Sequence, residues 1–106
     1  MANESMSQAE SLVLVGASLG ELCRRYQVKE LSLFGSAARG EMRAESDIDL
    51  MVEFELGVRM GLVRFESFVE DLEALTGRKV DVVTKRGLKP WIRPRVLEEA
   101  RIVYAA

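Results

Sequence analysis

The sequence predicts an α/β (α+β) fold, in which a small mixed β-sheet of three to four strands has helices packed on one face. Two observations support this prediction. Apolar residues recur at helical spacing over residues 7–26 and 62–76, whereas three shorter segments are apolar or alternating runs of the kind that form strands. These segments follow one another in the order α-β-(short α)-β-α-β-α-(β). A chain of 106 residues has the length of one domain, so we expect a single domain over residues 1–106.

The first helix is expected over residues 7–26, where the apolar stripe consists of Leu12, Val15, Leu19, Leu22, Cys23 and Tyr26. Cys23 is the only cysteine of the chain and cannot form an internal disulfide. In this pattern it is most simply a small buried apolar residue. A reducing, cytoplasmic setting is therefore the default expectation.

Strands are expected over residues 30–34 and 47–54. In the second of these, apolar residues occupy one parity, and the other parity carries Asp47, Asp49, Met51 and Glu53. Asp47 and Asp49 therefore project side by side from one face, about 7 Å apart at a rise of about 3.3 Å per residue. Two such carboxylates repel each other, and they are stable only in water or around a cation.

A second long helix is expected over residues 62–76. We interpret its apolar stripe as core rather than as a platform for stacking bases; the stripe consists of Phe65, Phe68, Val69, Leu72 and Leu75. Gly77 is suited to the position just after the helix, where left-handed backbone is common. A third strand is expected over residues 79–84, and it contains Asp81, a residue type that strands disfavour. A solvated strand aspartate is the alternative interpretation of Asp81.

The last part of the chain is rich in basic residues. From Lys85 to Arg95 there is no acidic residue, and this segment could reach a triphosphate, pair with an acidic partner or simply be solvated. Pro90 suits the first turn of a short helix that could run to about Glu99, and Pro94 would shorten or bend this helix unless it falls in the first turn itself. Residues 102–104 could add an edge strand.

Composition excludes several classes of function. The net charge of −2 gives no general attraction to nucleic acid or to anionic membranes, so we expect no direct nucleic-acid binding. No apolar run approaches the length that spans a bilayer, and the N-terminus lacks the regions of a signal peptide. The chain has no histidine, which excludes a Ser-His-Asp triad, a Cys-His pair and a histidine zinc site.

Gly35 and Ser36 directly follow the first strand, and they complement the two aspartates. A glycine at a strand end lets the backbone approach a ligand closely. If residues 36–39 begin a short helix, the backbone N–H groups there attract anions. Carboxylate oxygens such as those of Asp47 and Asp49 suit Mg²⁺, which takes further oxygens from substrate phosphates. Together these residues predict a nucleotide site, although each pair alone could be a plain turn or a solvated edge strand.

Gly35-Ser36, a spacer from Ala37 to Ser46, and then Asp47-Ile48-Asp49 on a strand resemble the signature of the DNA polymerase β-like nucleotidyltransferase superfamily. The longer pattern is similar to its minimal nucleotidyltransferase branch, and the resemblance covers nearly the whole chain. It implies the polymerase β-like nucleotidyltransferase fold. It further implies that Asp81, on the adjacent strand, completes a catalytic metal site with Asp47 and Asp49.

The resemblance implies a reaction in which two Mg²⁺ ions and ATP are used and AMP passes to an acceptor hydroxyl. The nucleotide is expected at Gly35, Ser36, Arg39 and Ser46, although Arg39 could instead fix the loop between the strands. Lys85 is a further candidate for stabilising phosphate charge. Asp81 is the candidate general base.

From the length of the sequence we expect no separate domain that binds the acceptor. Minimal members commonly pair with a helical HEPN toxin and transfer AMP to a toxin tyrosine, which makes them antitoxins in a hetero-oligomer. Two alternatives stay open, a non-catalytic antitoxin that acts by binding and an enzyme that modifies a small molecule such as an aminoglycoside. Trp91, in the basic segment, would either contact a partner or cap the core.

Overall fold

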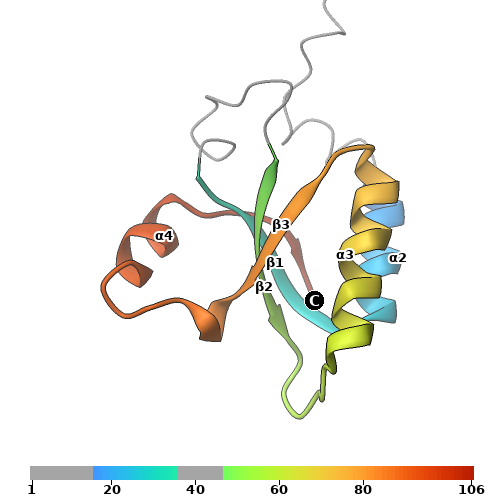
Figure 1. Ribbon diagram of the computed structural model, residues 1–106, viewed down its shortest axis with the longest axis horizontal. Helices are drawn as coiled ribbons and strands as arrows, with labels where there is room; N and C mark the ends of the chain where they lie inside the picture. The colour runs from blue at the N-terminus through green and yellow to red at the C-terminus, as the bar shows by residue number, and fades with distance from the viewer. Residues whose placement is uncertain (1–15, 36–46) are drawn as a thin grey trace, which may run out of the picture.

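The computed structural model describes residues 16–35 and 47–106 (Figure 1). Along the chain it contains α2 (Gly16–Arg25), β1 (Val28–Leu33), β2 (Ile48–Phe54), α3 (Leu62–Thr76), β3 (Val80–Thr84), the 3-10 turn η2 (Lys85–Gly87), α4 (Arg93–Glu99) and β4 (Arg101–Ala105). The strands form one sheet in the order β3-β2-β1-β4. Strand β1 is antiparallel to both β2 and β4, whereas β2 and β3 are parallel. The predicted fold class, a small mixed sheet with helices, is confirmed.

The long helix α3 has the predicted bounds, and Gly77 ends it in left-handed backbone at φ 71°. The other elements differ from the prediction by a few residues. Strand β1 begins at Val28, two residues before the expected start, and α2 matches only the second half of the predicted first helix. Residues 7–15 of that helix, and the short helix expected at 36–39, lie outside the described residues.

The helix predicted to start at Pro90 starts instead at Arg93, with Pro94 in its first turn. Proline has no N–H to donate and clashes with the preceding turn, so it is tolerated only where the first helical N–H groups are unpaired anyway. Residues before it form a tighter turn, in which the N–H groups of Ile92 and Arg93 both donate to the carbonyl of Lys89. Pro94, rather than Pro90, therefore sets the helix start.

Helices α2 and α3 pack together on one face of the sheet (Figure 1). The core between them and the sheet contains Phe68 and Leu72 of α3, both fully buried, as the apolar stripe predicted. The ring of Phe68 lies 5.2 Å from that of Tyr26 and 5.7 Å from that of Phe54. The interpretation of the aromatic stripe as core is confirmed.

Helix α4 lies on the opposite side of the sheet from α2 and α3 (Figure 1), so the helices do not all pack on one face as the sequence predicted. On that side Ser32 and Met51 face each other across β1 and β2, and both are buried, at 1% and 3% exposure. Val96 of α4 is buried as well, and neither Met51 nor Val96 belongs to the core under α2 and α3. The face of β2 that carries Asp49 is therefore buried in its middle, at Met51. It is more accessible toward its ends, at Asp49 and Glu53.

Candidate active site

The aspartates of the two parallel strands lie side by side. Asp49 of β2 and Asp81 of β3 are register partners, so their side chains project from the same face of the sheet. Asp47 stands just before β2, where it is exposed, and Asp81 is exposed as well. Asp49 is partly buried between them. The face that carries these carboxylates is the one turned away from α2 and α3, because Ile48 and Leu50 point into the core.

Gly35 closes the site from the end of β1. The backbone N–H of Phe34 donates to the carbonyl of Asp49 at 3.1 Å, which holds the turn against the start of β2. Gly35 has φ +70°, and a Cβ atom built on it would lie 2.8 Å from Oδ2 of Asp49. No real Cβ contact is that short, so a side chain here would displace the carboxylate. The turn therefore brings bare backbone directly against Asp49.

Among the described residues, the aspartates of the site carry negative charge that no neighbouring cation balances. Burial raises the pKa of Asp49 above its ordinary value, and the charges of Asp81 and Asp47 raise it further. Its carboxylate makes no ion pair or hydrogen bond with another described residue. A cation bound at this point would relieve both the repulsion and the desolvation.

Carboxylate oxygens on exposed and half-buried positions are the donors that Mg²⁺ prefers, together with water and phosphate oxygens. Within residues 16–35 and 47–106, no three acidic or cysteine side chains converge closely enough to form a metal cluster by themselves. The Asp49–Asp81 pair thus fits an ion that takes part of its coordination from a bound nucleotide and water, rather than a closed protein cage.

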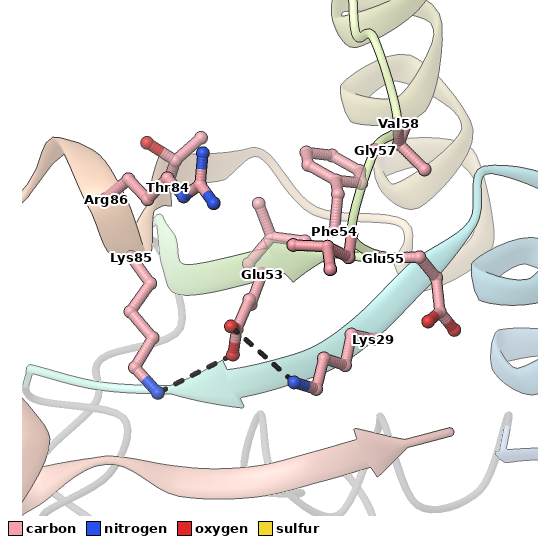
Figure 2. Close-up of a pocket in the computed structure, with 11 residues that line it drawn as sticks. Lys29, Glu53, Phe54, Glu55, Gly57, Val58, Thr84, Lys85 and Arg86 are labelled. Atoms are coloured by element: carbon pink, nitrogen blue, oxygen red, sulfur yellow. Dashed lines mark ion pairs between the residues drawn. The ribbon is translucent and has the colours of Figure 1, made fainter.

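The structure brings Gly35, Asp49 and Asp81 together, and Asp47 adjoins them. Ser36, Arg39 and Ser46, predicted to bind the nucleotide, lie outside the described residues. Lys85 is not brought to the aspartates. It follows the far end of β3 and pairs with Glu53 at 3.6 Å (Figure 2). The sequence left its role open, and local alternation could not tell which charged neighbour Lys85 would meet.

Trp91 does not cap the core. Its side chain is 77% exposed, and the ammonium of Lys89 lies 5.3 Å from its ring centre. The interpretation that leaves Trp91 at the surface is thus the one that the structure supports.

Comparison with known proteins assigns the chain to a family. The family model for the nucleotidyltransferase domain matches residues 17–104, so the chain belongs to the nucleotidyltransferase domain family. The enzyme class predicted from Gly35 and the aspartates is thereby confirmed.

Particular relatives narrow this class. The protein adenylyltransferase MntA of Thermococcus cleftensis is 40% identical over 104 residues, which covers 98% of this chain and 99% of the relative. A solved structure of a candidate minimal nucleotidyltransferase is 40% identical, with a TM-score of 0.76 over 92% of this chain and 96% of that one. The predicted resemblance to minimal nucleotidyltransferases is confirmed.

The fold also occurs in a toxin–antitoxin complex. In the structure of the tri-AMPylated Shewanella oneidensis HEPN toxin with its MNT antitoxin, the matching chain superposes with a TM-score of 0.64 at 18% identity. The match covers 90% of this chain and 73% of that chain. At this identity the likeness concerns the fold. In the described part of the present chain, no helix has the length and apolar character needed to cross a membrane.

Proposed function

We propose that this protein transfers AMP from ATP to a hydroxyl of a protein partner, a tyrosine of a helical HEPN-type toxin, and so acts as its antitoxin in the cytoplasm. One observation carries the proposal. Asp49 and Asp81 lie in register on one face, with the backbone of Gly35 directly against Asp49. This arrangement can hold a phosphate chain beside paired carboxylates. The naming of the Thermococcus cleftensis relative supports the choice of AMP as the transferred group.

Each residue has a separate task in this reaction. The turn at Gly35 and Ser36 would hold the phosphates of ATP, and Arg39 and Ser46 would add further contacts to the nucleotide. Asp47, Asp49 and Asp81 would hold two Mg²⁺ ions, which neutralise phosphate charge when bound. The acceptor oxygen forms a bond to the α-phosphorus while the bond to the β-phosphate oxygen breaks, and pyrophosphate leaves. Asp81, which is exposed, takes the hydroxyl proton.

A protein acceptor suits the exposure of the site. Asp47 and Asp81 are both exposed, so no element of the described chain closes over the reacting side chains. A hydroxyl carried on a partner's surface can therefore reach them. The exposed Trp91 beside Lys89 gives the chain an aromatic and basic surface feature of the kind that occurs at interface centres.

The experiment is co-expression with the helical partner, followed by intact mass measurement and by labelling with ATP that carries its label on the α-phosphate. The wild-type protein should add the mass of AMP to the partner. Asp49→Asn and Asp81→Asn should reduce labelling by at least about a hundredfold, as expected when a catalytic group is lost. Glu70→Gln, which removes an exposed carboxylate on α3, is the matched control and should label normally.

The alternatives give different results in the same experiment. A partner that is bound and inhibited yet never gains mass would replace catalysis with neutralisation by binding. AMP passed to a free small molecule such as an aminoglycoside, with no partner modified, would assign a small-molecule acceptor instead.

A further inference from the structure

A pocket of about 240 Å³ lies at the end of β2 and β3 remote from the aspartates (Figure 2). One wall is apolar and comes from the end of β2, with Phe54, and from the connection to α3, with Val58. The other wall is basic and consists of Lys29, Lys85 and Arg86. Along the strand direction, Asp81 and Lys85 are four residues apart, a separation of about 13 Å at about 3.3 Å per residue. The pocket therefore shares no side chain with the aspartate site.

Some of the charged side chains that line the pocket form ion pairs within the described chain, and others do not. Glu53 lies between two lysines, with its carboxylate 3.6 Å from Nζ of Lys85 and 4.0 Å from Nζ of Lys29 (Figure 2). Arg86, in contrast, makes no hydrogen bond or ion pair with another described residue. Three basic side chains line the pocket against two acidic ones, Glu53 and Glu55. Among the described residues, the guanidinium of Arg86 is therefore left without an acidic partner, and it points away from Glu53 and its two lysines (Figure 2).

Hydrogen bonds and an ion pair hold the turn that forms the basic wall of the pocket. The hydroxyl of Thr84 accepts the backbone N–H of Gly87 at 3.0 Å and so caps the turn that carries Lys85 and Arg86. A Cβ atom on Gly87 would lie 2.8 Å from this hydroxyl, so the turn fits closely around it. Lys85 is further held by Glu53, and its side chain is only 28% exposed. The turn that carries both residues is therefore held in place, and the Lys85 side chain is oriented by its ion pair with Glu53.

From this arrangement we propose that the pocket is a second ligand site, which binds a phosphate group in addition to the nucleotide at the aspartates. The guanidinium of Arg86 can form charge-assisted, bidentate hydrogen bonds to phosphate oxygens. The volume is below the range of about 300–1,000 Å³ typical of pockets for larger ligands, which favours a small ligand. The apolar wall accommodates an organic part next to the phosphate. Inorganic phosphate and a small phosphate monoester share this chemistry.

The test is titration of the ¹⁵N-labelled full-length protein, first with inorganic phosphate and then with AMP, without Mg²⁺ or ATP. The amide signals of Gly57 and Gly87 report on the pocket, and that of Gly35 reports on the aspartate site. We expect both ligands, or AMP alone, to shift the signals of Gly57 and Gly87. Shifts with phosphate and AMP alike would identify the phosphate group as sufficient, whereas shifts with AMP alone would show that the organic part is needed.

Arg86→Ala should weaken this binding by about tenfold or more, since it removes a charge-assisted contact. This variant should fold normally because Arg86 is exposed and unpaired within the described chain, and its spectrum checks that. Arg95→Ala, which removes an exposed arginine of α4 outside the pocket, should bind as the wild type does. Gly87→Ala should weaken binding while leaving every charge in place, as expected for a positioning residue.

The proposal is overturned if neither ligand shifts the signals of Gly57 and Gly87 at millimolar concentration, or if Arg86→Ala binds as tightly as the wild type. Shifts confined to Gly35 that disappear in Asp49→Asn would also overturn it, because they would place the ligand at the aspartates. None of these results depends on adenylyl transfer, so they leave the proposed function to its own test.

Discussion

At the scale of single residues, the close contact between the backbone of Gly35 and the carboxylate of Asp49 shapes the site. The positive φ of Gly35 is a conformation that other residues adopt only with strain, and the space beside it is taken by the carboxylate of Asp49. Gly57 has a similar positive φ of +85°, but nothing lies within 4 Å of the position of its missing Cβ. Comparing substitutions at the two glycines therefore distinguishes the effect of backbone strain from the effect of a side chain that contacts Asp49.

Gly35→Ala and Gly57→Ala should each lower the free energy of unfolding by more than about 1 kcal/mol, because alanine at positive φ is strained. Only Gly35→Ala should also reduce adenylyl transfer strongly, since its methyl group pushes Asp49 aside. Chemical denaturation and the labelling assay measure the two effects separately. Equal loss of labelling in both variants would show that the site responds to stability alone, contrary to the contact inferred here.

Asp49 should make the metal-free protein less stable at neutral pH than an asparagine would. Its pKa is raised in the folded state by burial and by Asp81 and Asp47, so the neutral form is favoured by folding. The stabilisation from that form is complete below the ordinary aspartate pKa and is lost as the pH rises through the raised value. In EDTA, Asp49→Asn should therefore melt higher than the wild type at pH 7, by a few degrees. The difference should vanish at a pH below the ordinary aspartate pKa, and a gain of equal size there would contradict the assignment.

At the scale of elements, a polar contact joins the two helices that cover the core face. The hydroxyl of Tyr26, just after α2, donates to the carboxylate of Asp71 on α3 at 2.6 Å, and Arg25 pairs with the same oxygen at 3.3 Å. The Tyr26 side chain is otherwise buried against Phe68. The hydrogen bond to Asp71 raises the pKa of Tyr26 above its ordinary value, with burial and the charge of Asp71 adding to it.

Tyr26→Phe should lower the free energy of unfolding by about 1.5–3 kcal/mol, as for a hydrogen bond to a charged group. The raised pKa fixes the pH dependence. The tyrosine's contribution is complete below its ordinary pKa of about 10 and is lost as the pH rises through the higher folded value. The difference between wild type and variant should thus be constant from neutral pH to about pH 9 and should shrink above about pH 10. Tyr104→Phe, which removes a half-buried hydroxyl on β4, is the control; a loss as large there would argue against a specific role of the Tyr26–Asp71 bond.

Local pattern was sufficient for some elements and not for others. The apolar stripe and Gly77 predicted α3, because the packing face and the end of this helix both depend on residues close together in the sequence. Alternation correctly placed Asp49 and Asp81 on the side opposite the core. It could not predict that Met51, of the same parity as Asp49, is buried, because burial on that face depends on tertiary packing. The sequence misplaces the start of α4, because Pro90 and Pro94 are both suited to the first turn of a helix.

For the site as well, the sequence predicted the features that depend on local pattern and missed those that depend on tertiary contacts. The order of the motif was enough to nominate Gly35, Asp49 and Asp81, since a strand's period and a turn residue are local properties. The contact between Gly35 and Asp49 depends on how the turn after β1 folds onto β2, which no periodicity encodes. The pairing of Lys85 with Glu53 likewise depends on the parallel register of β2 and β3. Tertiary pairing, rather than propensity, decided these contacts.

At the scale of the whole molecule, the exposed apolar side chains indicate where a partner could bind. Several of them come from the C-terminal part of the chain, and Trp91 is the largest, at 77% exposure. Leu56, at 90% exposure, lies instead in the connection between β2 and α3, where it lines the pocket proposed as a second ligand site. Exposed aromatic residues flanked by basic ones are typical of residues that dominate binding energy once a partner covers them.

Trp91→Ala should weaken the complex with the helical partner by about tenfold or more, the loss typical of an interface residue that costs over about 1.4 kcal/mol. The free energy of unfolding of the free protein should hardly change, because the tryptophan side chain leaves water only in the complex. Leu56→Ala removes a side chain that is even more exposed, and it should leave the affinity unchanged. Calorimetric titration of each purified variant with the partner measures the affinities. If Leu56→Ala weakened binding and Trp91→Ala did not, the partner would bind at the connection between β2 and α3, and the surface assigned to it here would be wrong.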